Sequence, residues 1–143
     1  MAKNLTAFLA QNAKKIDNAA YVASDRFIDP ETGKPMSWEI CCITAAENAA
    51  LRKSCMYTVP VPGRKGQFTQ EFDANAYLVK ISARCTVFPN LNDAEVQQSY
   101  GVMGAEQLIA TMLTPAEFED YSTKVLNVNG FQSGEEMVAD AKN

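Results

Sequence analysis

The chain has 143 residues, of which 47% are hydrophobic and 21% charged, a composition that suits one folded domain over residues 1–143. It contains no histidine, which excludes Ser-His and Cys-His nucleophilic pairs within one chain and every histidine-ligated metal site. Residues 1–72 carry nine Lys/Arg against seven Asp/Glu, whereas residues 73–143 carry four against ten, so the net charge of −4 comes from an acidic C-terminal half. This imbalance argues against nucleic acid as the main partner.

The N-terminal stretch MAKNLTAFLAQNAKK predicts a short helix from about Leu5 to Lys14 that Asn4 caps. Its apolar part is too short for a signal peptide and is interrupted by polar residues. No apolar run approaches the ~20 residues that a membrane span needs. We therefore expect a cytoplasmic protein with no membrane partner.

The segment SDRFIDPETGKPMSWEI, Ser24 to Ile40, predicts an N-terminal β-hairpin around the turn Asp29-Pro30-Glu31-Thr32-Gly33. Its second strand alternates, so Met36, Trp38, Ile40 and Cys42 share one apolar face. A hairpin alone in water is marginally stable, and this face therefore needs a cover. We expect the cover to be the helix that follows Thr44, with the charges of Asp25, Arg26 and Glu39 keeping foreign strands off the hairpin edges.

The next helix is predicted from Thr44 to about Cys55, because Thr44 and Glu47 have the spacing of a capping box. Residues 58–71 are then predicted to be a flexible loop, since prolines and glycines cluster there. The run Gly63-Arg64-Lys65-Gly66 resembles a phosphate loop only superficially, because no G-x-x-x-x-G-K-[ST] pattern is present. Ordering of the loop on a partner remains an alternative.

The acidic half predicts a series of capped helices. Asp73 and Asp93 are suitable N-caps, and Thr114-Pro115-Ala116-Glu117 combines a capping box with proline at the first helical position. A helix over 105–113 lies between them, and a short last helix is expected over Met137 and Val138.

The fold class expected from these elements is α+β, a mainly helical domain of five to seven helices with one N-terminal β-hairpin. Apolar periodicity predicts the core. Its expected members are Trp38, Ile40, Leu51, Tyr77, Leu78, Ile81, Leu108, Ile109, Met112, Phe118, Tyr121 and Leu126.

No catalytic, cofactor-binding or metal-binding residues are predicted. Cys41, Cys42, Cys55 and Cys85 contain no C-x-x-C pair, and we expect them to be buried or half-buried reduced thiols. The carboxylates at 117, 119 and 120 lie at a helix start, where the helix dipole already explains them. These observations favour a binding protein over an enzyme.

The order of the hairpin, the helix ending LRKSC, the stretch FPNLNDAEVQQSYGV and the helix start LTPAEF resembles the XkdN-like tail assembly chaperones of phages and prophages. The resemblance covers roughly Leu5 to Phe131 and lies in fold signatures, not in a catalytic motif. It implies a non-structural factor of tail morphogenesis that binds the tape-measure protein, keeps it soluble, helps recruit the tail-tube protein and is absent from the finished virion.

The resemblance also implies that copies of the chain bind one another, and that some members of the family are made in a frameshift-extended form. Two alternatives stay open beside it. One is a structural tail or head–tail connector component that remains in the virion. The other is a small cytoplasmic enzyme or regulator, against which the missing histidine and the acidic charge argue.

Overall fold

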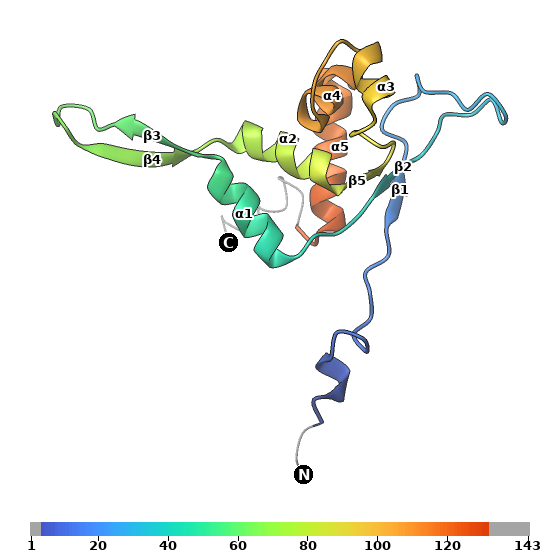
Figure 1. The fold of residues 1–143 in the computed structure, drawn as a ribbon, viewed down its shortest axis with the longest axis horizontal. Helices are drawn as coiled ribbons and strands as arrows, with labels where there is room; N and C mark the ends of the chain where they lie inside the picture. The colour runs from blue at the N-terminus through green and yellow to red at the C-terminus, as the bar shows by residue number, and fades with distance from the viewer. Residues whose placement is uncertain (1–3, 132–143) are drawn as a thin grey trace, which may run out of the picture.

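Five α-helices and two small antiparallel sheets build the part of the chain that the computed structural model describes, residues 4–131 (Figure 1). The helix expected over Met137 and Val138 lies outside the described residues. The N-terminal half contains η1 (Thr6–Phe8, a 3-10 turn), β1 (Ala19–Tyr21), β2 (Trp38–Ile40), α1 (Ala45–Ser54), β3 (Met56–Pro60) and β4 (Phe68–Phe72). The C-terminal half contains α2 (Ala74–Cys85), β5 (Thr86–Phe88), α3 (Ala94–Ser99), α4 (Ala105–Met112) and α5 (Pro115–Val128).

The helix starts follow the predicted caps. The side chains of Asp73, Asp93 and Thr114 each accept a hydrogen bond from a backbone N–H in the first turn of the helix that follows. At Thr114 the capping box is complete, because Glu117 also accepts from the Thr114 N–H at 2.9 Å. At Thr44 the hydroxyl accepts from the Glu47 N–H at 3.1 Å, but the Glu47 carboxylate pairs with Arg84 at 2.8 Å and does not return to the cap.

The core lies where α2 packs against α4 and α5. Ile81, Leu108, Ile109 and Tyr121 are fully buried, as their helical spacing predicts. The predicted residues Trp38, Ile40, Tyr77 and Met112 are buried as well, whereas Leu51, Leu78, Phe118 and Leu126 are only half-buried. Six further buried hydrophobic residues were not among the expected core members: Ala23, Cys55, Cys85, Leu91, Leu113 and Val125.

The predicted N-terminal hairpin is part of a three-stranded sheet in the order β1-β2-β5. Tyr21 is opposite Trp38 at its base, and a bridge joins Ile28 to Pro35 near the turn, where Gly33 has a φ of 70° that favours glycine. Between these two points residues 22–27 oppose only residues 36 and 37. β5 adds a third strand beside β2. The expected two-stranded hairpin is therefore corrected to a three-stranded sheet with β2 at its centre.

The apolar face of the hairpin leans on α5, and the expectation that α1 covers it is wrong. The Trp38 ring lies 5.1 Å from the Tyr121 ring at an interplanar angle of 67°, an edge-to-face contact, and 6.1 Å from the Phe27 ring. The physical reason is that α1 is a polar helix with no buried residue, whereas α5 offers a buried aromatic ring. α1 instead packs against α2, where the Tyr77 hydroxyl bonds to Asn48.

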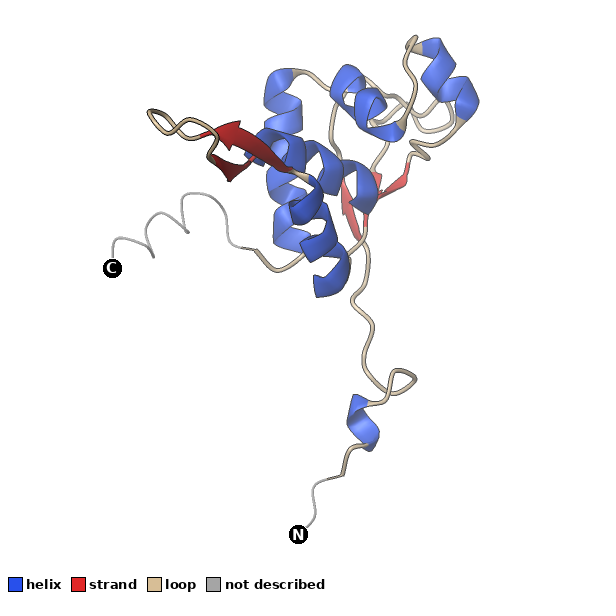
Figure 2. Cartoon of the chain, turned by 60° about the vertical axis from the view of Figure 1, so that its left-hand side comes forward, coloured by secondary structure: helices blue, strands red, loops and turns tan. Residues whose placement is uncertain are grey.

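A second hairpin spans the segment that was predicted to be a loop. β3 and β4 pair in regular antiparallel register from Met56 opposite Phe72 to Pro60 opposite Phe68, so strand residues replace loop at both ends of 58–71. Only residues 61–67 connect them. Pro60 is tolerated because it is at the last pair, where a strand can lose an N–H. The hairpin projects from the helices in both views (Figures 1 and 2).

The predicted N-terminal helix over Leu5–Lys14 is wrong in extent. Only the single 3-10 turn η1 forms, and residues 4–18 are all exposed. An isolated helix this short is marginal unless its apolar face packs against something. The segment leaves the body at β1 and projects away from the helices (Figures 1 and 2).

Candidate binding surfaces

The described residues give no support to a metal site or to an activated thiol. No group of three or more Cys, Asp or Glu side chains within residues 4–131 is arranged to hold a metal ion. Cys55 and Cys85 are buried and Cys41 and Cys42 half-buried, all as free thiols. Burial raises the pKa of the Cys85 thiol to about 11, despite a contact from the Asn129 amide at 3.5 Å. A thiol with so high a pKa is a weak nucleophile near neutral pH.

Glu117, in the first turn of α5, has a structural role. Arg26, on the irregular side of the first hairpin, donates to the Met112 carbonyl at 2.6 Å and to the Glu117 carboxylate at 2.9 Å. The bond from Arg26, followed by those from Ser24 and Thr114, holds the pKa of Glu117 at about 2 instead of its ordinary 4.5. The pair therefore pins the hairpin to the α4–α5 corner. Glu119 and Asp120 are exposed on the same helix.

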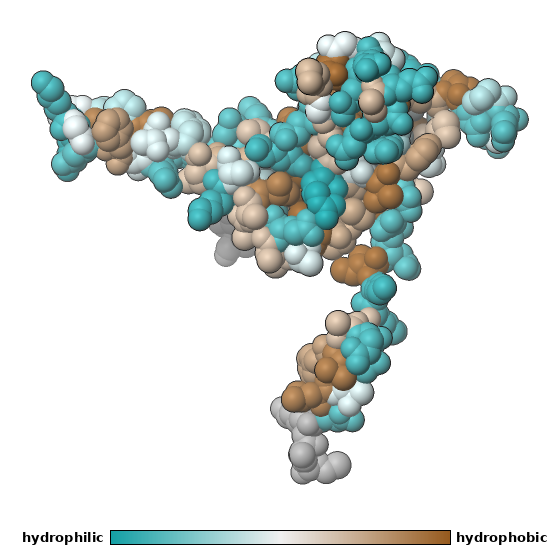
Figure 3. Space-filling view, in the orientation of Figure 1, coloured by the Kyte–Doolittle hydropathy of each residue, from teal (hydrophilic) through white to brown (hydrophobic). Residues whose placement is uncertain are grey.

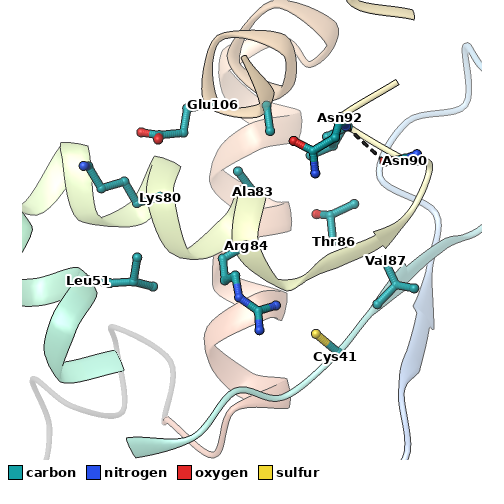
Figure 4. Close-up of a pocket in the computed structure, with 12 residues that line it drawn as sticks. Cys41, Leu51, Lys80, Ala83, Arg84, Thr86, Val87, Asn90, Asn92 and Glu106 are labelled. Carbon is teal, nitrogen blue, oxygen red and sulfur yellow. Dashed lines mark hydrogen bonds between the residues drawn. The ribbon is translucent and has the colours of Figure 1, made fainter. Parts of the chain in front are cut away.

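A polar-rimmed groove of about 640 Å³ lies along α2, and we call it the α2 groove. Its apolar floor comes from Leu51, Ala83, Leu91 and Ala105. Its rim carries Lys80, Arg84, Asn90, Asn92 and Glu106, and Figure 4 shows these polar side chains around Ala83. The Asn92 N–H donates to the Asn90 side chain at 3.0 Å, which fixes that end of the rim.

Elements far apart in the sequence build this groove. The helix α2 supplies Lys80, Ala83 and Arg84, and β5 supplies Thr86 and Val87. The remaining lining residues come from α1, the residue after β2, the β5–α3 connection and the start of α4. No local sequence motif indicates a site that is built from distant elements, and for that reason it was not predicted from the sequence.

A second, smaller groove is apolar throughout, and we call it the Trp38 groove. It has a volume of about 250 Å³ and lies between the first hairpin, the end of β5, α3 and the end of α4. Its lining residues are Phe27, Met36, Trp38, Phe88, Pro89, Val96, Tyr100 and Met112. A groove with this lining suits an apolar side chain of a partner.

Two projecting elements expose large apolar side chains. On the β3–β4 hairpin Met56, Tyr57 and Phe68 are exposed, and Arg64 and Lys65 lie in its connecting loop. Aromatic and β-branched residues on both sides of the Pro/Gly cluster were the sequence signal that could have indicated this hairpin. On the N-terminal segment Leu5, Phe8, Leu9 and Ile16 are exposed, and this segment shows a patch of hydrophobic colour in Figure 3.

No helix within the described residues is long and apolar enough to span a membrane.

Comparisons of the sequence and of the structure with known proteins agree with one another. The family model described as phage XkdN-like tail assembly chaperone protein matches residues 5–142. The protein YqbN of Bacillus subtilis (strain 168) is 25% identical over 142 residues, which cover 98% of this chain and 93% of that protein. A crystal structure of the protein YqbN superimposes with a TM-score of 0.76 at 20% identity, covering 92% of this chain and all of that one. That structural likeness supports the fold.

Proposed function

Because this chain belongs to the phage XkdN-like tail assembly chaperone family, we propose that it binds the tape-measure protein and keeps it soluble while the phage tail is assembled. The observation that carries the proposal is the family match, which extends over residues 5–142 and so over nearly the whole chain. In this proposal a single chaperone domain, residues 1–143, acts in the host cytoplasm without catalysis. The tail-tube protein is a second partner.

The exposed apolar surface supports a binding role. A folded chain that keeps Phe68 and Met103 at 65% and 86% exposure has apolar side chains available for a partner. Phe68 lies on the β3–β4 hairpin and Met103 between α3 and α4, so they offer separate small contacts and not one contiguous patch. A tape-measure chain is long, and several weak contacts along it would combine into avidity.

We assign the α2 groove as the site for a helical segment of the tape-measure protein. An amphipathic helix places apolar residues at i, i+3, i+4 and i+7, and such a row fits an apolar floor like that of Leu51, Ala83 and Leu91. The rim carries charges of both signs, positive at Lys80 and negative at Glu106, and these would select the orientation of the bound helix.

The test is co-expression of this protein with the tape-measure protein of the same phage. We expect soluble tape-measure protein only when both are present, with several chaperone copies in each complex after gel filtration at low salt. A tape-measure protein that stays insoluble in both cases would refute the proposal.

Paired variants locate the site. Ala83→Arg places a bulky side chain on the floor of the α2 groove, whereas Ala110→Arg makes the same change at an exposed position of α4 outside the groove. We expect Ala83→Arg to lower the yield of soluble complex and Ala110→Arg to leave it unchanged. Because Ala83 is half-buried against the core, the melting temperature of both variants is measured alongside to separate lost binding from lost stability. Equal effects would exclude the groove as the site.

Mass spectrometry of purified virions tests the role as an assembly factor. We expect the protein to be absent from finished particles. Stoichiometric amounts in particles would favour the structural tail or head–tail connector component.

A further inference from the structure

The N-terminal segment, residues 4–16, has the sequence of an amphipathic helix without the surface that such a helix needs. Leu5, Phe8 and Leu9 have i, i+3, i+4 spacing, yet their exposed fractions are 70%, 81% and 47%, and Ile16 is 67% exposed. Within the described residues, the hydrogen bonds of residues 4–13 join that stretch to itself. A stretch with helical periodicity and nothing to pack on is poised to fold when a complementary surface is supplied.

The Trp38 groove has the shape and chemistry to receive such a stripe. Its lining is apolar, and its volume is about 250 Å³. An apolar cavity of about 150 Å³ is already large enough to hold a benzene ring. The groove therefore has room for the Phe8 ring together with part of a neighbouring leucine.

The charges of the two surfaces are complementary. The elements that frame the groove carry five carboxylates: Asp25, Asp29, Glu31, Asp93 and Glu95. Against these stand Lys34 and Arg26, and Arg26 is already bonded to Glu117. Residues 4–16 carry Lys14 and Lys15 and no carboxylate. Opposite charges at the rim of an apolar contact speed encounter and select the register of binding.

The geometry favours binding in trans. The segment leaves the body at β1 and projects away from it, whereas the groove lies between the first hairpin and α3, on the other side of β1 (Figure 1). We propose that residues 4–16 of one copy bind as an amphipathic helix in the Trp38 groove of a second copy, with Phe8 as the anchor. This contact is separate from the α2 groove, so it does not rest on the proposed tape-measure binding.

Photo-crosslinking of the full-length protein tests the contact directly. Phe8 is replaced by the photoreactive residue p-benzoylphenylalanine in ¹⁵N-labelled chains, which are mixed with unlabelled chains before illumination. We expect cross-linked peptide pairs of mixed isotope content that join position 8 to peptides containing Met36, Phe88 or Tyr100. Cross-links confined to one chain, cross-links to another surface, or no cross-link would each overturn the proposal.

Sedimentation velocity over a range of concentrations supplies the energetic test with a matched control. Phe8→Ser and Met103→Ser each remove a highly exposed apolar side chain, 81% and 86% exposed, but Met103 belongs to neither surface. Burial of a phenylalanine side chain predicts that Phe8→Ser weakens self-association by at least about tenfold, while Met103→Ser changes it less than about twofold. Concentration-independent sedimentation of the wild type, or equal effects of both variants, would refute the contact.

The same variants separate the two proposals. Phe8→Ser should weaken association between copies by at least about tenfold and leave one-to-one binding of an isolated tape-measure helix unchanged. Ala83→Arg should weaken binding of the isolated tape-measure helix and leave association between copies unchanged. A loss of both activities in both variants would show that the surfaces are not independent.

Discussion

Replacement of Trp38 by alanine should remove the main aromatic contact between the first sheet and α5 and lower the free energy of unfolding. The indole is 2% exposed and touches two aromatic rings, Phe27 at 6.1 Å and Tyr121 at 5.1 Å between ring centroids. Truncation of a buried Trp typically costs about 3–5 kcal/mol, through lost burial and the cavity left behind. Because a domain is stable by only about 5–15 kcal/mol, this loss is a large share of the free energy of unfolding.

The assay is urea denaturation followed by far-UV circular dichroism, since the variant removes the chain's single tryptophan. With a denaturant slope of about 1–3 kcal/mol/M, the midpoint should fall by at least about 1 M. Tyr57→Ala serves as the control, because Tyr57 is 46% exposed on the β3–β4 hairpin and should cost less than about 1 kcal/mol. A loss below about 1 kcal/mol for Trp38→Ala would refute the packing argument.

Three further predictions concern pH, proteolysis and the thiols. The pKa of Glu117 is lowered to about 2, mainly by its hydrogen bond with Arg26. The stability that this carboxylate contributes is therefore complete above about pH 4.5 and is lost as the pH falls toward 2. In an acid titration, the stability of Glu117→Gln should decline less steeply over this range than that of the wild type. Trypsin should cut first in the exposed segments at Arg64 or Lys65 and at Lys14 or Lys15, and early cleavage inside α2, at Lys80 or Arg84, would contradict this. Chelator and reductant should leave the melting temperature unchanged, and a drop of several degrees with chelator would indicate a structural metal.

Short-range chemistry in the sequence was enough to place the helix starts. Asp73, Asp93 and Thr114 cap their helices because a side-chain oxygen needs only the N–H groups two or three residues on. The turn at Gly33 and the helical stripes of Ile81 and Leu108 were predictable for the same reason, since they depend on the chain within one or two turns.

The tertiary structure alone decided which surfaces meet. β5 joins β2 across more than forty residues, and Arg26 reaches Met112 and Glu117 across about ninety, contacts that no local pattern encodes. The two grooves exist only because several distant elements converge. The N-terminal segment also shows that a local pattern is not sufficient. Its stripe of Leu5, Phe8 and Leu9 predicts a helix, but a helix this short is stable only where another surface buries its apolar face. The folded chain does not bury this face, and only a 3-10 turn forms.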